Sequence, residues 1–303
     1  MGVLEGQTVL VTGGGNGIGR DCALIAAREG ANVLVNDLGS SLTGDDTGDA
    51  GPAEAVARQI RAEGGNAIAN ADSVTDYAAV QAMVDQALDH FGGLHAVINP
   101  AGIVRDRMFH KMGEDDWDSV IDVHLRGTFN VCRATINHFR AQQYGAYVLF
   151  SSTSGLFGNV GQSNYGAAKM GIVGLSRIIA MEGDACNVRS NVIAPAAWTR
   201  MTQAIPVKDE RGAEMMKLLA EKMRPDQPAR LAVALAAPSA GISGQIFGAK
   251  GDEITLYSQP RPIAQVDRAE GWTPATIIAD ALPAMASDFT AVWDKPSFLP
   301  TNA

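Results

Sequence analysis

Residues 7–37 read QTVLVTGGGNGIGRDCALIAAREGANVLVND, and this stretch decides the fold. Its first five residues form a short apolar run that predicts a strand, and a glycine-rich turn follows at once. An amphipathic helix is expected over 17–29, where Gly30 ends it, and a second strand over 32–36. Strand, glycine turn, helix and strand make one βαβ unit, which predicts a doubly wound parallel sheet with its ligand at the carboxyl edge.

The glycines of the turn have separate roles in a dinucleotide site. Gly13 permits a sharp turn, Gly17 lets the backbone approach a pyrophosphate, and Gly19 lets the helix pack close to the strand. The carboxylate of Asp37, at the end of the second strand, can accept both ribose hydroxyls and would repel a 2′-phosphate. No arginine follows within four residues, so NAD(H) is expected rather than NADP(H). A plain glycine-rich turn is the alternative that this stretch alone leaves open.

A second pattern lies in residues 151–169, SSTSGLFGNVGQSNYGAAK. Tyr165 and Lys169 are four residues apart, so both lie on one face of a helix, and Ser152 precedes them. A cation about 4 Å from a phenol, at an effective dielectric of about 20, favours the phenolate by roughly 4 kcal/mol. That lowers the pKa by up to about 3 units before desolvation opposes it. The pattern predicts a proton-transfer group poised near neutral pH, although the same spacing also occurs on solvated helices without such a role.

The spacing T-G-x-x-x-G-x-G at 12–19, together with Ser152, Tyr165 and Lys169, resembles the short-chain dehydrogenase/reductase family over roughly residues 5–250. The resemblance implies an NAD-dependent oxidoreductase in which these three residues are catalytic. It also implies a set of cofactor contacts at Gly13, Asn16, Gly17, Ile18, Gly19, Asp37, Asp72, Ser73, Asn99, Ala101, Gly102, Tyr165, Lys169 and Pro195.

Three positions depart from the family pattern. Pro100 replaces the second Asn of N-N-A-G and removes one backbone N–H, and Ala196 stands where a glycine usually follows Pro195. Both are expected to affect only loop geometry. His124 replaces the Asn that completes the proton relay of the family. Either it orients the relay water through its carbonyl or its ring, or it is a buried core residue.

The implied chemistry is hydride transfer with a secondary alcohol or ketone, where Tyr165 moves the hydroxyl proton and Ser152 hydrogen-bonds the substrate oxygen. A closer resemblance is to the (3R)-hydroxyacyl-CoA dehydrogenase subgroup, which includes the dehydrogenase unit of multifunctional enzyme type 2 (17β-hydroxysteroid dehydrogenase type 4) and stand-alone bacterial relatives. It is carried by VLVNDLG at 33–39, INPAGIVRDRMF at 98–109 and GNVGQSNYGAAKMGIVGL at 158–175. It implies oxidation of a (3R)-hydroxyacyl-CoA to a 3-ketoacyl-CoA.

Two other functions stay open on the sequence. One is an NAD-dependent dehydrogenase of hydroxysteroids or other cyclic alcohols, and the other is a catalytically silent nucleotide-binding scaffold protein. Four basic residues, Arg105, Arg107, Lys111 and Arg200, either meet the phosphates of an acyl-CoA or form a solvated, charge-balanced surface.

The composition bounds these functions. The chain has 303 residues, of which 46% are hydrophobic, and a net charge of −9, which suits one large α/β domain. The acidic balance and the lack of basic tracts argue against nucleic acid, and no run of 18 apolar residues predicts a membrane span. Three cysteines without metal-ligand spacing predict buried thiols and no metal site. Since a strand begins within a few residues, no signal peptide is expected, and the predicted location is cytoplasmic.

The predicted fold is a doubly wound, Rossmann-type, mostly parallel seven-stranded sheet in residues 1–250, with a substrate lid at 200–228. Residues 251–303 are proline-rich and predict an extension packed on the domain or on a neighbouring subunit. The family resemblance implies a homodimer or homotetramer through helices 114–142 and 163–184. Strands are expected near 7–12, 32–36, 66–70, 94–99, 145–151, 188–193 and 244–248. The remaining helices are expected near 52–63, 75–91, 209–222 and 227–237.

Overall fold

A computed structural model of the chain describes residues 2–45, 51–199 and 209–294. These residues form two compact units that divide between Tyr257 and Ser258. The first unit holds the glycine turn and all the predicted site residues, and the second is the C-terminal extension.

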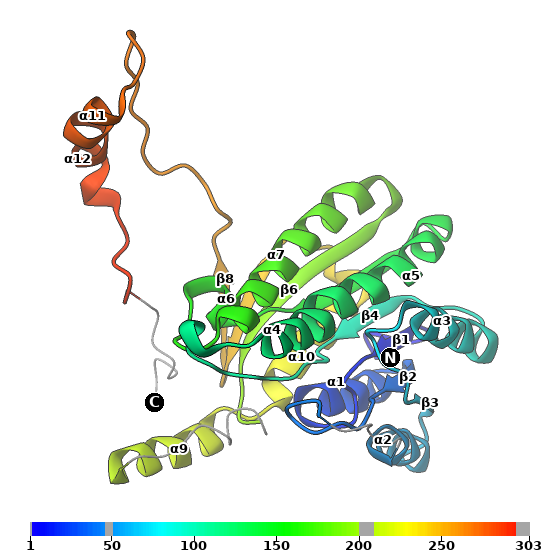
Figure 1. Ribbon diagram of the computed structural model, residues 1–303. Helices are drawn as coiled ribbons and strands as arrows, with labels where there is room; N and C mark the ends of the chain where they lie inside the picture. Colours follow the sequence, from blue (N-terminus) through cyan, green and yellow to red (C-terminus); the bar gives the residue numbers. More distant parts are fainter. Residues whose placement is uncertain (1, 46–50, 200–208, 295–303) are drawn as a thin grey trace. The chain divides into compact units, whose positions relative to one another are not determined.

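The first unit is built on one eight-stranded sheet with the order β3-β2-β1-β4-β5-β6-β7-β8 (Figure 1). Strands β1 to β7 are parallel, and β8 pairs with β7 in the antiparallel direction. The strands are β1 (Thr8–Val11), β2 (Asn32–Asn36), β3 (Asn66–Asn70), β4 (Ala96–Asn99), β5 (Gly145–Phe150), β6 (Val188–Ala196), β7 (Ile246–Lys250) and β8 (Glu253–Tyr257).

The sheet has eight strands where the sequence predicted seven. Strand β8 follows β7 after a two-residue turn in which Gly251 has a φ of +55°, so β7 and β8 form a hairpin. As an edge strand it leaves Ile254 and Leu256 exposed, so its residues lack the buried apolar run that marks the parallel strands. The proline-rich segment that follows also made a strand difficult to predict at this position.

Helices cover both faces of the sheet. One hydrophobic core lies between the sheet and helices α1, α2 and α10, and a second lies between the sheet and helices α3, α5 and α7. In β1, Val9 and Val11 point into the first core and Leu10 into the second, as the two-residue period of a strand requires. The helices of this unit are α1 (Gly17–Arg28), α2 (Gly51–Ala62), α3 (Tyr77–Phe91), α4 (Glu114–Ile121), α5 (Gly127–Ala141), α6 (Thr153–Phe157), α7 (Ser163–Gly183), α9 (Glu210–Lys222) and α10 (Asp226–Ala236), with 3₁₀ turns at Phe109–Lys111, Asp184–Cys186 and Pro238–Ala240.

The helix predicted over 114–142 is interrupted. A π-helical turn, Asp122–Arg126, joins α4 to α5 and carries His124. Such turns add a residue to the helix and redirect nearby side chains and carbonyls, and they occur often at functional sites. The short helix α6 was not predicted; it begins after Ser152, whose Oγ accepts a 3.1 Å hydrogen bond from the N–H of Ser154.

Two predicted segments need separate comment. The predicted lid begins with residues 200–208, which lie outside the described residues, and the rest of it includes helix α9. The second unit contains α11 (Pro274–Thr276), a π-helical turn (Ile277–Ala281), α12 (Leu282–Met285) and a 3₁₀ turn (Ala286–Asp288). Among its described residues only Ala281 is buried. None of the described helices combines the length and the apolarity needed to cross a bilayer.

Candidate active site

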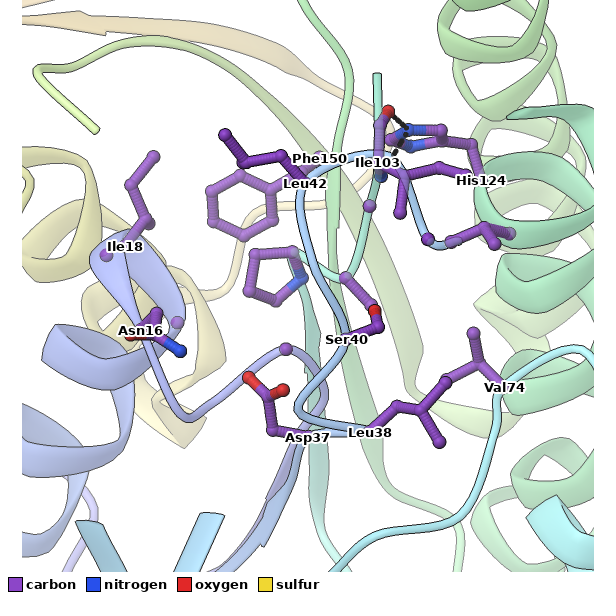
Figure 2. A pocket seen from close by; sticks show the side chains of 18 of the residues that line it. Asn16, Ile18, Asp37, Leu38, Ser40, Leu42, Val74, Ile103, His124 and Phe150 are labelled. Atoms are coloured by element: carbon purple, nitrogen blue, oxygen red, sulfur yellow. Dashed lines mark hydrogen bonds between the residues drawn. The ribbon is translucent and has the colours of Figure 1, made fainter. Parts of the chain in front are cut away.

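A cavity of about 480 Å³ opens at the carboxyl edge of the sheet, beside the ends of β1 and β4 where the strand order reverses. Figure 2 shows side chains from well-separated parts of the chain around it, including Asn16, Asp37 and His124. Most of the predicted site residues line this cavity: Gly13, Asn16, Gly17, Ile18, Gly19, Asp37, Asp72, Ser73, Ala101, Gly102, His124, Tyr165, Lys169 and Pro195.

The glycine turn between β1 and α1 is shaped by close contacts. Gly13 has a φ of +57°, and a Cβ there would lie 2.8 Å from the Cα of Ala101. A Cβ on Gly19 would collide with the carbonyl of Gly13, so that position also requires glycine. Asn16 precedes α1 without capping it, so the first-turn N–H groups keep their capacity to bind an anion. These residues fit a diphosphate.

Asp37 lies where β2 ends, on the cavity wall. Its Oδ2 accepts a 2.8 Å hydrogen bond from the N–H of Gly15, and its Oδ1 accepts a 2.7 Å hydrogen bond from Gly39. A carboxylate has lone pairs for about four such bonds, so capacity for two hydroxyl donors remains. Asp72 follows β3 and is held by Asn70, whose Nδ2 donates to its Oδ2 at 2.8 Å. Two acidic side chains, Asp37 and Asp72, therefore line the cavity.

Tyr165 and Lys169 lie together on α7, as their spacing predicted. The Nζ of Lys169 is 5.5 Å from the centre of the Tyr165 ring and donates a 2.7 Å hydrogen bond to the carbonyl of Phe150 at the end of β5. The hydroxyl of Ser152 lies close enough to Tyr165 to oppose the rise of its pKa, although Ser152 does not itself line the cavity. The structure thus brings a phenol, an amine and a hydroxyl to one point.

The prediction that Tyr165 has a pKa near neutral is wrong, because burial moves that pKa in the opposite direction. Burial raises the pKa of Tyr165 to about 12, against the hydrogen bond from Ser152, which favours the phenolate, and with a smaller contribution from Asp106. Burial also lowers the pKa of Lys169 to about 7, so the amine carries only part of its charge at neutral pH. The four-residue spacing predicted that the two side chains lie together, but it did not predict that the loss of water around them would raise the pKa of Tyr165 and lower that of Lys169.

His124 is buried beside this pair, with its ring edge-on to that of Tyr165 and the two centres 5.1 Å apart. Its Nε2 lies 2.7 Å from the carbonyl oxygen of Ile103 and 3.2 Å from the Ile103 nitrogen. Its Nδ1 is buried without a hydrogen-bond partner among the described residues. Burial and the nearby Lys169 ammonium hold the pKa of His124 well below its usual value, so the ring is neutral.

Asn99 does not line the cavity, in contrast to the expectation that it contacts the cofactor. It is buried in a chain of side chains that joins β1 to α5. Thr12 Oγ1 donates to Asn99 Oδ1 at 2.5 Å, Asn99 Nδ2 donates to Thr128 Oγ1 at 2.9 Å, and Thr128 Oγ1 donates to the carbonyl of His124 at 2.5 Å. Asn99 therefore supports the site indirectly, through hydrogen bonds that connect Thr12 to Thr128 and the carbonyl of His124.

The predicted basic cluster is dispersed. Arg105 donates to the carbonyl of Thr43 at 2.8 Å and to Asp45 at 2.6 Å, so its guanidinium is already engaged. Arg107 is exposed and has Asp116 3.5 Å away, and Lys111 is also exposed. Arg200 lies outside the described residues.

Sequence reasoning missed one whole side of the cavity, which is formed by residues 38–44. No sequence-based prediction placed the loop after β2 beside the cavity. The carbonyl of Phe150 that holds Lys169 was also missed, because a backbone acceptor leaves no sequence signal.

Comparison with known proteins identifies the family. The short chain dehydrogenase family model matches residues 7–210. The peroxisomal multifunctional enzyme type 2 of Mus musculus is 44% identical over 243 residues, which are 80% of this chain and 31% of that protein. The hydroxyacyl-CoA dehydrogenase ChsB1 of Mycobacterium tuberculosis is 36% identical over 290 residues, covering 91% of this chain and 87% of that one.

A solved structure agrees with both. The crystal structure of a short chain dehydrogenase from Mycobacterium avium matches with a TM-score of 0.80 and 36% identity, over 93% of this chain and 96% of that one. This chain spans only about a third of the mouse protein, so the other parts of that protein have no counterpart in the match. With the fold, the glycine turn and the Ser152–Tyr165–Lys169 set all in place, the chain belongs to the short chain dehydrogenase family and is an oxidoreductase.

Proposed function

We propose that the chain is an NAD-dependent dehydrogenase that interconverts (3R)-hydroxyacyl-CoA and 3-ketoacyl-CoA. The observation that carries the proposal is that Tyr165 and Lys169, with Ser152 beside Tyr165, line the same cavity as Asp37 and the glycine turn. The sequence similarity to a hydroxyacyl-CoA dehydrogenase of Mycobacterium tuberculosis supports the choice of substrate.

The chain's own residues fit a dinucleotide. The N–H groups at the start of α1 would hold the diphosphate, and the carboxylate of Asp37 would accept the two hydroxyls of the adenosine ribose. A 2′-phosphate at that ribose would meet the Asp37 charge, which favours NAD(H) over NADP(H). Asp72 and Ser73 would lie beside the adenine, and Lys169 beside the other ribose. Bound NAD⁺ supplies the hydride acceptor.

Three side chains divide the remaining work. In alcohol oxidation Tyr165 takes the hydroxyl proton, and in ketone reduction it returns that proton to the substrate oxygen. Ser152 donates a hydrogen bond to the same oxygen and stabilises the charge that develops there. Because burial raises the pKa of Tyr165 to about 12, its phenol is protonated at neutral pH and is ready to donate. At neutral pH the phenol is therefore in the protonation state that ketone reduction uses.

His124 is the fourth member of the proposed site. Its ring is neutral, and its unpartnered Nδ1 belongs to a side chain that lines the cavity beside Lys169. A buried polar atom in this position fits a water molecule that bridges to the amine. His124 would then hold the water of the proton relay through its ring, because its carbonyl already accepts from Thr128.

Assembly and location complete the proposal. Helices α5 and α7 expose apolar side chains, among them Phe129, Met170, Ile178 and Met181, which fits a homodimer or homotetramer formed through these helices. The extension exposes Ile278, Phe289, Val292 and Trp293, which need cover from the same chain or a neighbouring subunit. The proposed compartment is the cytoplasm.

A spectrophotometric screen tests this function. Purified protein would be assayed at 340 nm with NADH and NADPH against 3-ketoacyl-CoAs and ketosteroids, and with NAD⁺ and NADP⁺ against the matching alcohols. We expect the highest kcat/KM for NADH with a 3-ketoacyl-CoA. Turnover of ring ketones alone would favour a hydroxysteroid dehydrogenase, and nucleotide binding without turnover would favour a silent scaffold.

A further inference from the structure

The loop after β2 forms one wall of the cavity. Residues 38–45, here called the strap, leave the end of β2 and run beside the cavity towards the segment that follows β4. Figure 2 shows this chain passing from Asp37 and Leu38, past Ser40, to Leu42 near Ile103. Leu38, Ser40, Leu42 and Gly44 belong to the cavity lining, which also includes the glycine turn. A dinucleotide in the cavity would therefore lie between the glycine turn and the strap.

The far end of the strap is fastened by one side chain. Arg105 donates from Nε to the carbonyl of Thr43 at 2.8 Å and from Nη2 to Asp45 Oδ1 at 2.6 Å. The side chain of Arg105 is only 18% exposed, whereas that of Asp45 is 65% exposed. One backbone hydrogen bond adds to this, from the N–H of Val104 to the carbonyl of Leu42 at 3.1 Å.

The segment that holds Arg105 is tied to the catalytic residues. The ring of His124 contacts the backbone of Ile103, and the carbonyl of Arg105 accepts a 3.0 Å hydrogen bond from Asn164 Nδ2. Asn164 is fully buried and its Oδ1 accepts the N–H of Tyr165 at 2.7 Å. The backbone of Arg105 is thus held by contacts outside the strap, so we expect the strap, and not Arg105, to move when the two separate.

We propose that Arg105 is a positioning residue for the cofactor, which fastens the strap over the dinucleotide so that cofactor exchange requires the strap to detach. The inference rests on the proposed function only in taking the ligand of the cavity to be a dinucleotide. Detachment breaks few contacts between the strap and the 103–105 segment, which suits a segment that opens in each turnover. The same hydrogen bonds use two of the five guanidinium N–H groups of Arg105 within the chain itself.

The test measures cofactor exchange without any substrate. NADH would be bound to the full chain, and its dissociation rate measured in a stopped-flow instrument from the fluorescence change on mixing with excess NAD⁺. The variants are Arg105→Ala, Asp45→Ala, the double variant, and the conservative Arg105→Lys. Arg107→Ala is the matched control, because it removes a nearby arginine that has no hydrogen bond to the strap.

We expect Arg105→Ala to raise the NADH dissociation rate about tenfold, because it removes two hydrogen bonds, one of them charge-assisted. Asp45→Ala should raise it about two- to fivefold, since its carboxylate is largely exposed. The double variant should match Arg105→Ala, Arg105→Lys should recover part of the loss, and Arg107→Ala should leave the rate unchanged. In steady state the KM for NAD⁺ should rise in Arg105→Ala while kcat does not fall.

Other outcomes separate the possible failures. Unchanged NADH dissociation in both Arg105→Ala and Asp45→Ala overturns the inference, and so does an effect of Arg105→Ala confined to the KM of an acyl-CoA. If Arg105→Ala does not fold, Asp45→Ala alone decides the matter, because it changes only an exposed side chain. If the unaltered chain binds NADPH and not NADH, the proposed cofactor fails, and the same variants test the strap with NADPH.

Discussion

The Nζ of Lys169 lies 5.5 Å from the centre of the Tyr165 ring and donates to the carbonyl of Phe150, so the catalytic pair is held by the end of β5 as well as by α7. Lys169 is buried and Tyr165 is partly buried, and the loss of water moves their pKa values towards the neutral forms, to about 12 for Tyr165 and about 7 for Lys169. Tyr165 therefore keeps its proton at neutral pH, whereas Lys169 is only partly protonated there. This has a direct consequence for the pH dependence of the two reaction directions.

Alcohol oxidation should accelerate with rising pH, because Tyr165 must first lose its proton. We expect kcat/KM for oxidation to rise about tenfold per pH unit from pH 7 to 9, as for one titrating group with a pKa above that range. Ketone reduction needs the protonated phenol and should show no such rise. Initial rates in both directions across this range provide the measurement. Oxidation that is flat over the same interval would show that the phenol is already ionised in the working complex.

Replacing Asp37 should change the choice of cofactor. Asp37→Ser removes the carboxylate that we propose faces the ribose, and with it both the acceptor for the hydroxyls and the charge that would repel a 2′-phosphate. We expect kcat/KM for NADP⁺ relative to NAD⁺ to rise by at least about tenfold, which corresponds to about 1.4 kcal/mol. Asp76→Ala, on the exposed start of α3, serves as the control, because its carboxylate only caps that helix. An unaltered cofactor ratio in Asp37→Ser would contradict the assignment.

The sequence was sufficient for features that depend on neighbours along the chain. The strand, glycine turn and helix at 7–28 are local, and the four-residue spacing of Tyr165 and Lys169 fixed their shared helix face. Strand β8 was missed because an edge strand with exposed Ile254 and Leu256 lacks the apolar run of a buried one. The apolar pattern of a single strand does not tell whether that strand lies inside the sheet or at its edge, where one side is exposed to water.

The rest depended on contacts between distant residues. The pKa directions of Tyr165 and Lys169 follow from the loss of water around these two side chains, which their spacing in the sequence does not report. Asn99 matched a family motif but lies behind the cavity, because Thr12 and Thr128 take its side-chain hydrogen bonds. The sequence offered Arg105 as a candidate phosphate ligand, but its side chain forms hydrogen bonds with Thr43 and Asp45 of the strap.

The ring of His124 occupies the space that a side chain at position 102 would need, since a Cβ on Gly102 would collide with it. Gly102→Ala should therefore destabilise the protein by about 1–3 kcal/mol, measured by urea unfolding. Adding His124→Ala should relieve the collision, so the double variant should be more stable than the two single effects predict. Simple additivity of the two changes would show that the ring and residue 102 do not compete.

Arg107 offers a test of the acyl-CoA assignment, because it is exposed and its ion pair with Asp116 is long at 3.5 Å. If it meets a CoA phosphate, Arg107→Ala should raise the KM for a 3-ketoacyl-CoA several-fold and leave the KM for a pantetheine-truncated thioester unchanged. Equal effects on the two substrates would remove Arg107 from phosphate binding and leave it as a surface residue.

The central claim is that Tyr165 transfers the proton while NAD(H) exchanges the hydride, and Tyr165→Phe tests it most directly. The variant keeps the ring and its contact with His124 but lacks the phenol oxygen. NADH binding, followed by fluorescence titration, should stay within about twofold of the unaltered chain, whereas kcat should fall by about 10²–10⁴-fold. Turnover that survives in Tyr165→Phe with NADH binding intact would contradict the claim.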